Sequence, residues 1–153
     1  MDNGANNAVG QARLLSEAMQ CDDWGAAARL LSPDCSYFHV ARDVRGPQAI
    51  VECFQRDNKW GDNQFDSIER ERSVEPGPDG RAMITCLYHI RHKGHSLTIR
   101  SEHIIELNEA GLIGRIEQIE LASQANALFR FYMKVGIIRK SKPDQDGRDE
   151  AGN

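Results

Sequence analysis

Residues 81–121 read as three long strands joined by two short turns, and no other feature of the sequence constrains the fold as strongly. Lys93 and Gly94 form the first turn, because a two-residue hairpin loop needs positive φ angles that glycine adopts readily. A two-residue loop also fixes which residues face each other across the hairpin. The predicted pairs on one face are Ala82–Ile105, Ile84–His103, Cys86–Ser101, Tyr88–Ile99 and Ile90–Leu97.

That face is apolar except for His103 and Ser101, so it is the face expected to turn toward a core or a pocket. The opposite face of the same hairpin is mixed and suits solvent or a partner subunit. Its predicted pairs are Met83–Ile104, Thr85–Glu102, Leu87–Arg100 and His89–Thr98.

The second turn, near residues 108–111, leaves two registers open. A five-residue loop pairs Leu107 with Ile113 and places Glu117 beside His103, whereas a four-residue loop turns Gln118 inward instead. The pattern of apolar residues favours the five-residue loop. It would create a buried histidine and carboxylate pair.

The remaining elements follow from helical spacing, capping residues and turn residues. Asp22 or Asp23 caps the second helix, Ser32–Asp34 ends it, and Pro47 suits the first position of the third. The sequence predicts helices over 8–20, 24–31, 47–56 and 125–135, strands over 35–40 and 64–74, turns over 42–46 and 75–80, and a loop over 57–63.

The length of 153 residues suits one domain, which we expect over residues 1–138, followed by a polar and disordered tail over 139–153. The net charge of −4 argues against a nucleic-acid or anionic-membrane surface. The first residues lack a signal-peptide pattern, and no apolar run approaches the length of a membrane span. We therefore expect a cytoplasmic protein.

The four cysteines lie in or beside apolar stretches and lack the close pairing of zinc ligands, so they are interpreted as reduced core thiols. His89, His92 and His95 cluster at the first turn. His92 and His95 flank a turn that is expected to face water, and His89 is expected on the opposite face from His103. We predict no metal site and no cofactor.

Two phrases, DDWGAAARLLSPDCSYFHV and IIELNEAGLIGRIEQIEL, and the order of elements over residues 8–121 resemble the nuclear transport factor 2-like superfamily and its SnoaL-like members. The resemblance implies an α+β fold. In this fold a cone-shaped, curled and mostly antiparallel sheet encloses a pocket, three N-terminal helices close it, and here a C-terminal helix follows. It also implies an ungapped terminal hairpin, and hence the four-residue turn.

Ketosteroid isomerases belong to this group, and the resemblance aligns their general base with His39 and their oxyanion-binding aspartic acid with His103. Their oxyanion tyrosine falls near Leu15, which donates no hydrogen bond, so steroid isomerisation is not expected. The Asp-Arg-Asp constellation of limonene-epoxide hydrolases is not found on the strand at 81–92.

Tyr37 and His39 are two residues apart on one strand and point to the same side, which the resemblance directs into the pocket. We predict a catalytic role for His39 as general base, and for His103, Tyr37 or Tyr88 as the partner that donates a hydrogen bond to a developing oxyanion. The predicted substrate-binding residues are Tyr88, Ser101, Ile99, Glu117 and Trp24, although Trp24 is most simply a packing residue.

The predicted function is cofactor-free acid–base chemistry on a small hydrophobic organic molecule, of the isomerase, dehydratase or cyclase type. The alternative is a protein that only binds a ligand, or a homo-oligomeric association module. The partners expected are the organic ligand and a second copy of the chain, which forms a homodimer through the mixed outer face of the sheet, with no nucleic acid and no membrane.

Overall fold

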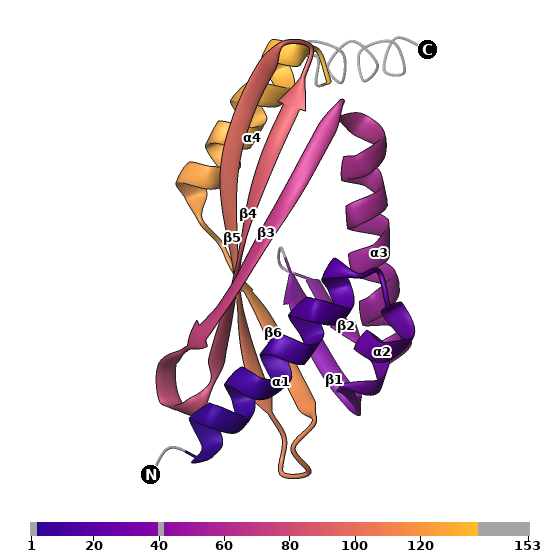
Figure 1. The fold of residues 1–153 in the computed structure, drawn as a ribbon, viewed down its shortest axis with the longest axis vertical. Helices are drawn as coiled ribbons and strands as arrows, with labels where there is room; N and C mark the ends of the chain where they lie inside the picture. The colour runs from indigo at the N-terminus through magenta and orange to yellow at the C-terminus, as the bar shows by residue number, and fades with distance from the viewer. Residues whose placement is uncertain (1–2, 40–41, 138–153) are drawn as a thin grey trace, which may run out of the picture.

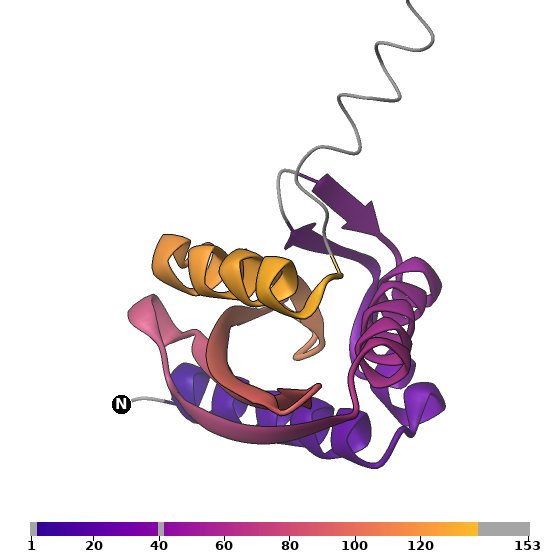
Figure 2. The same cartoon turned by 90° about the horizontal axis from the view of Figure 1, so that it is seen from above.

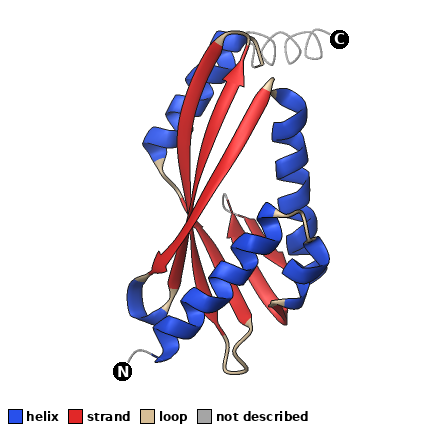
Figure 3. Ribbon diagram, viewed as in Figure 1, coloured by secondary structure: helices blue, strands red, loops and turns tan. Residues whose placement is uncertain are grey.

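The computed structural model describes residues 3–39 and 42–137, which form an α+β fold around one six-stranded sheet (Figures 1 and 3). The helices are α1 (Asn3–Gln20), α2 (Trp24–Arg29), α3 (Pro47–Gln64) and α4 (Ala122–Val135), with a short 3-10 turn η1 (Pro78–Gly80). The strands are β1 (Leu31–His39), β2 (Arg42–Arg45), β3 (Ser67–Pro76), β4 (Ala82–His92), β5 (His95–Leu107) and β6 (Ile113–Ile119). The predicted fold class is confirmed.

The sheet has the strand order β2-β1-β6-β5-β4-β3 and is antiparallel except where β1 runs parallel to β6. Its long strands β3, β4 and β5 twist and curl strongly, and Figure 2 shows them curving around a space bordered by α3 and α4. The sheet therefore forms an open cone rather than a closed barrel. Among the described residues, no helix has the length and apolar character needed to cross a membrane.

The hairpin of β4 and β5 has the predicted register at every pair, from Ala82–Ile105 to Ile90–Leu97. Lys93 and Gly94 form its two-residue turn with φ angles of 50° and 76°. Both values are positive, as a type I′ turn requires. Ile84, Cys86 and Ile90 accordingly face the core.

The hairpin of β5 and β6 begins as the five-residue loop predicts, with Leu107 paired to Ile113. The register then shifts, because Glu106 pairs with Arg115 and leaves Gly114 as an extra residue in β6. Beyond this bulge His103 pairs with Gln118. The prediction that Glu117 lies beside His103 is therefore wrong.

The bulge exists because β6 must bury two isoleucines that are three residues apart. Ile113 and Ile116 are 0% and 1% exposed. In a regular strand residues three apart point to opposite faces, so one extra residue between them is needed to bring both inside. Gln118 follows Ile116 by two residues and faces the same way.

The first three helices match their predicted positions in outline. Asp23 caps α2 by accepting a hydrogen bond from the backbone N–H of Ala26, and Pro47 occupies the first turn of α3 after Gly46. Gly46 has a φ angle of 90°, a conformation that glycine adopts at little cost. The predicted cap at Asp23 and the predicted start at Pro47 thus correspond to observed helix ends.

Three local predictions are wrong. Strand β1 begins at Leu31 rather than at residue 35, although its pairing with β6 shifts register between Leu31 and Ser36. Residues 42–45 form β2, which pairs with β1, where a turn was predicted. Helix α3 continues through the predicted loop to Gln64, because Trp60 packs edge-on against Phe65 there.

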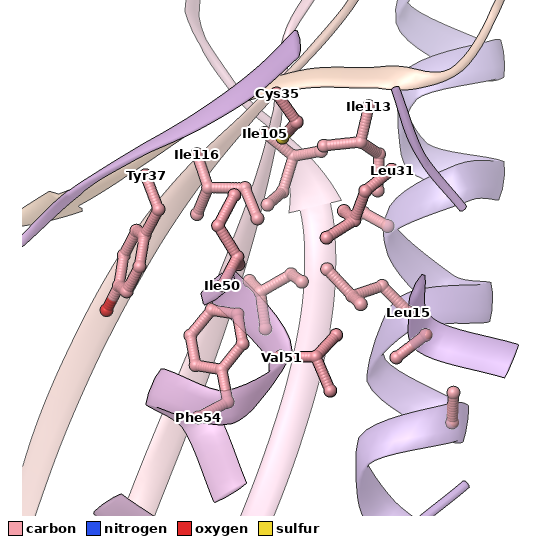
Figure 4. Close-up of a cluster of buried hydrophobic side chains, with 14 of the residues drawn as sticks. Leu15, Leu31, Cys35, Tyr37, Ile50, Val51, Phe54, Ile105, Ile113 and Ile116 are labelled. Atoms are coloured by element: carbon pink, nitrogen blue, oxygen red, sulfur yellow. The ribbon is translucent and has the colours of Figure 1, made fainter. Parts of the chain in front are cut away.

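The core consists of two clusters on the inward face of the sheet. The main cluster lies between the sheet and α1, α2 and α3, and Figure 4 shows Leu15, Ile50 and Phe54 from these helices beside the isoleucines of the sheet. The second cluster lies under α4 and comprises Phe65, Ile90, Phe131 and Val135. The inward face of the sheet is thus covered by different helices at its two ends.

Helix α4 ends at Gly136, as predicted, and this glycine has a left-handed φ angle of 85°. The predicted disordered tail at 139–153 lies outside the described residues. The helix begins at Ala122, directly after β6, and Figure 1 shows it running alongside β5. It therefore covers the inward face of the sheet at this end.

Deleting Gly114 and Arg115 together should destabilise the protein by about 2 kcal/mol or more, the scale expected when a buried isoleucine side chain is lost from a core. Ile113 and Ile116 then become neighbours in the chain, and neighbouring residues of a strand point to opposite faces. Urea denaturation measures the change. The matched control is deletion of Gly114 alone, which leaves Ile113 and Ile116 two residues apart and therefore on one face of a regular strand. Equal stability of the two variants would contradict the role of the bulge.

Candidate functional site

Two adjoining cavities lie on the inward face of the sheet. The first, which we call the histidine chamber, has a volume of about 80 Å³ and includes Tyr37, His39 and His103 in its wall. The second, the apolar cavity, has a volume of about 470 Å³ and lies between α4, the end of α3 and strands β4 and β5. Its size falls in the range of small-molecule pockets.

The two cavities share part of their walls. The residues that line both are Asp57 and Asn58 of α3, Tyr88 of β4 and Gln118 of β6. A volume of about 80 Å³ has room for only a few water molecules or one functional group. A molecule in the apolar cavity could therefore extend a single reactive group between these shared residues into the histidine chamber.

His39, at the end of β1, has one ring nitrogen engaged and one free to accept a proton. Its Nδ1 donates a hydrogen bond to Oε1 of Gln118, so in the neutral ring Nε2 carries the lone pair. The ring stacks on Tyr37 with 5.3 Å between centroids. Gln118 therefore fixes the tautomer, and Tyr37 fixes the position of the ring.

Tyr37 joins His39 to His103. The Tyr37 hydroxyl lies 3.3 Å from Nε2 of His103, and its ring packs on Phe54. Tyr37 is 2% exposed, and burial raises the pKa of its hydroxyl far above the ordinary value. The hydroxyl therefore stays protonated and able to donate, and Figure 4 shows it pointing away from the aliphatic side chains.

His103 is neutral at physiological pH. Burial is the main cause that lowers its pKa to about 4, and the charges of His39 and Arg72 lower it further. A neutral imidazole can accept the Tyr37 hydrogen bond or donate one to it, depending on the tautomer. His103 is therefore suited to hydrogen bonding and not to carrying charge.

Arg72 brings a positive charge to the chamber wall. It projects from β3 opposite Cys86, and its Nη1 donates to Oε1 of Gln20 at 2.7 Å. Within residues 3–39 and 42–137 it forms no ion pair with a carboxylate. This guanidinium is therefore available to an anionic or developing negative oxygen in the chamber.

Tyr88 and Ser101 lie at the junction of the cavities, where Ser101 Oγ donates to the Tyr88 hydroxyl at 3.3 Å. Burial raises the pKa of Tyr88 to about 12. Ile99, paired with Tyr88, lines the apolar cavity. These three residues give the junction two neutral polar groups beside an apolar wall.

Six of the eight predicted site residues line a cavity, and Glu117 and Trp24 line neither. The Gly114 bulge sets Glu117 on the other face of β6, beside Arg115 at 3.6 Å. Trp24 packs against the main core. The catalytic and binding roles assigned to the other six stay predictions.

Sequence reasoning missed Arg72, Asp57 and Asn58 as chamber residues. Arg72 belongs to the charged strand at 64–74, where alternate residues face inward, and Ile68 and Val74 on the same face carry the signal that could have found it. Asp57 and Asn58 were predicted in a loop, and they reach the chamber because α3 continues.

Neither a family model nor a curated protein matches the sequence. Solved structures do match. The protein Bal32a, from a soil-derived mobile gene cassette, is 18% identical with a TM-score of 0.65, over 83% of this chain and 98% of that one. A "putative polyketide cyclase" from Xanthomonas campestris is 17% identical with a TM-score of 0.60, over 80% and 96%.

A third match is RV0760c from Mycobacterium tuberculosis in complex with estradiol-17β-hemisuccinate. It is 15% identical with a TM-score of 0.53, over 77% of this chain and 96% of that one. At identities this low the likeness shows the fold alone. The chain shares the α+β fold of these proteins, with its curled, cone-shaped sheet, as the resemblance implied.

Replacing His103 by Gln should remove much of the acid sensitivity of the protein. Between the folded pKa of about 4 and the unfolded value of about 6.5, the unfolded chain binds more protons, so stability falls as pH falls. The difference amounts to about 3 kcal/mol lost between pH 7 and pH 4.

Urea denaturation at several pH values measures this slope, which we expect to be shallower in His103→Gln than in the wild type. His89→Gln is the matched control, because His89 lies on the outer face and bonds Thr98 and Glu71. An unchanged slope in His103→Gln would refute the low pKa.

Proposed function

We propose that the protein binds a small hydrophobic organic molecule in the apolar cavity and catalyses proton transfer at a carbon next to a carbonyl group. One observation supports this above all. A base lone pair on His39 and a protonated Tyr37 hydroxyl line the same small chamber, which shares its wall with a cavity large enough for the rest of the molecule.

In this proposal His39 is the general base. Nε2 takes a proton from the carbon, and the Nδ1–H bond to Gln118 holds the ring in the orientation and tautomer that the step needs. The proton then returns to another atom of the same molecule, which is isomerisation, or assists the loss of a leaving group, which is elimination. No cofactor is required for either.

Tyr37, His103 and Arg72 stabilise the negative charge that develops on the carbonyl oxygen. Tyr37 donates its O–H to that oxygen, while neutral His103 donates Nε2–H to the Tyr37 oxygen. The unpaired charge of Arg72 acts over the same small space. Fixed donors in a water-poor chamber stabilise such an oxyanion more strongly than water does.

The comparison with RV0760c is consistent with a ligand of this class, because that protein holds estradiol-17β-hemisuccinate in the same fold. The ligand is a large hydrophobic molecule. The apolar cavity of this protein has walls of Ile90, Ile99, Leu128 and Tyr132, which suit fused rings.

The proposal predicts hydrogen–deuterium exchange at the acidic carbon of a bound ketone. Wild-type protein in D₂O with 2-tetralone or 1-indanone, followed by proton NMR, should exchange the α protons faster than buffer does. His39→Gln should lower the rate by about 100-fold, the scale of general-base catalysis. Tyr37→Phe should lower the exchange rate by a comparable factor. His103→Gln should lower the exchange rate by a larger factor than it lowers the affinity for the ketone.

The control for this experiment is His89→Gln, which alters a histidine outside both cavities and should keep the wild-type rate. Ketone binding is followed separately by calorimetry. If ketones bind and no variant differs from wild type in exchange, the catalytic proposal is wrong.

A ligand carrier is the second candidate function, and the size of the apolar cavity favours it. That cavity is about six times as large as the chamber, at about 470 against 80 Å³, and its lining is mainly apolar. A carrier would bind hydrophobic molecules with affinities that His39→Gln leaves unchanged. Binding without exchange would select this function.

We further propose a homodimer formed through the outer face of the sheet. Met83 and Leu87 are half-buried on the face of β4 that both core clusters leave free. Such apolar side chains among charges suit a subunit contact.

Leu87→Glu should convert a dimer into a monomer, because a carboxylate in the contact would lose its hydration. Light scattering after size-exclusion chromatography measures the mass. Leu14→Glu on α1, where Leu14 is 49% exposed, is the matched control and should leave the mass unchanged. A monomeric wild-type protein would contradict the dimer.

A further inference from the structure

The side of the histidine chamber formed by α3 gathers three side chains of the types that bind transition metals. The ligand atoms of His39, Cys53 and Asp57 all lie within 4.8 Å of one another. Cys53 and Asp57 are four residues apart on α3 and share one face of the helix, which lies toward the end of β1 where His39 stands. Sequence reasoning weighed the cysteine spacing and the histidines at the first turn, and neither brings His39, Cys53 and Asp57 together.

We propose that His39, Cys53 and Asp57 bind a divalent transition metal ion such as Zn²⁺, with the fourth coordination position open to the chamber. One sulfur, one imidazole nitrogen and one carboxylate oxygen form a set that Zn²⁺ accepts. Three protein ligands and one open position are typical of sites at which zinc meets a small molecule. His39 and Asp57 line the chamber, whereas Cys53 is 2% exposed and closes the site from behind.

The orientation of His39 supports the proposal independently. Nδ1 donates to Gln118, which leaves Nε2 as the nitrogen that can coordinate a metal. Metal-binding histidines generally donate their second ring N–H to an oxygen acceptor, which sets the tautomer and strengthens the ligand. Gln118 supplies that acceptor here.

The charges also balance. A thiolate, a carboxylate and a neutral imidazole carry two negative charges, which a divalent cation neutralises. Metal binding therefore releases the Cys53 thiol proton to solvent as the sulfur–metal bond forms.

The distances require only a small adjustment of side chains. Tetrahedral bonds of zinc to nitrogen, oxygen and sulfur place the ligand atoms roughly 3.3 to 3.8 Å apart. Atoms that lie within 4.8 Å of one another need to approach by at most about 1.5 Å, and rotation of the exposed Asp57 side chain can supply most of this. Asp57 is exposed and free to rotate.

This site shares His39 with the proposed function but does not depend on it. In the metal-free protein Nε2 of His39 is available as a base, and in the metal-bound protein the ion occupies that lone pair. Zinc should therefore inhibit the proton exchange described above. Metal binding itself is measured without any organic ligand.

The experiment is a titration of reduced, chelator-treated protein with Co²⁺, which reports its ligands by absorption, followed by competition with Zn²⁺. We expect one equivalent to bind and to give a thiolate-to-cobalt charge-transfer band in the near ultraviolet. Cys53→Ser should abolish that band. Asp57→Asn, at an exposed position that should tolerate the change, should weaken binding by at least about tenfold, the loss produced even by outer partners of metal ligands.

Cys21→Ser is the matched control, since Cys21 is an exposed thiol remote in sequence from the three ligands. It should keep both the band and the affinity. The proposal is overturned if wild-type protein gives no charge-transfer band, if Cys53→Ser and Asp57→Asn bind Co²⁺ as wild type does, or if Cys21→Ser removes the band. Exchange activity without metal binding would refute the metal site alone, and metal binding without exchange would refute the catalytic proposal alone.

Discussion

The position of one extra residue, Gly114, determines how the inward face of the structure is built. Because the bulge falls between Ile113 and Ile116, both isoleucines enter the core and Gln118 follows them inward. Gln118 then meets His39 from β1 and lies opposite His103 of β5. Burial of the two isoleucines thus sets the position of the Gln118 amide, which orients the ring of His39.

The long hairpin at 82–107 could be predicted residue by residue, because a two-residue turn leaves no freedom of register. The second hairpin could not. The five-residue loop correctly pairs Leu107 with Ile113. Both predicted registers assumed a regular ladder along β6, and a bulge in the strand breaks that assumption for Glu117 and Gln118. Burial inside the strand, and not the turn, decided the register.

The site was predictable to the extent that strand alternation decides it. Tyr37, His39 and His103 line the chamber because alternation and the hairpin register put them on the inward face. Arg72 escaped notice because its strand alternates charged residues on both faces. Asp57 and Asn58 escaped because α3 continues beyond residue 56, where Trp60 and Phe65 contact Tyr132, a residue distant in sequence. Cys53 escaped because only the folded chain brings it near His39.

Helix α4 closes one side of the apolar cavity alone, and it rests on the small second cluster of Phe65, Ile90, Phe131 and Val135. The histidine chamber rests on the main core and on residues of β1, β5 and β6. The two parts of the pocket are therefore separately supported. Substitutions under α4 can widen or narrow the range of molecules admitted while the reacting groups keep their geometry, so this architecture lets selectivity and chemistry diverge independently during evolution.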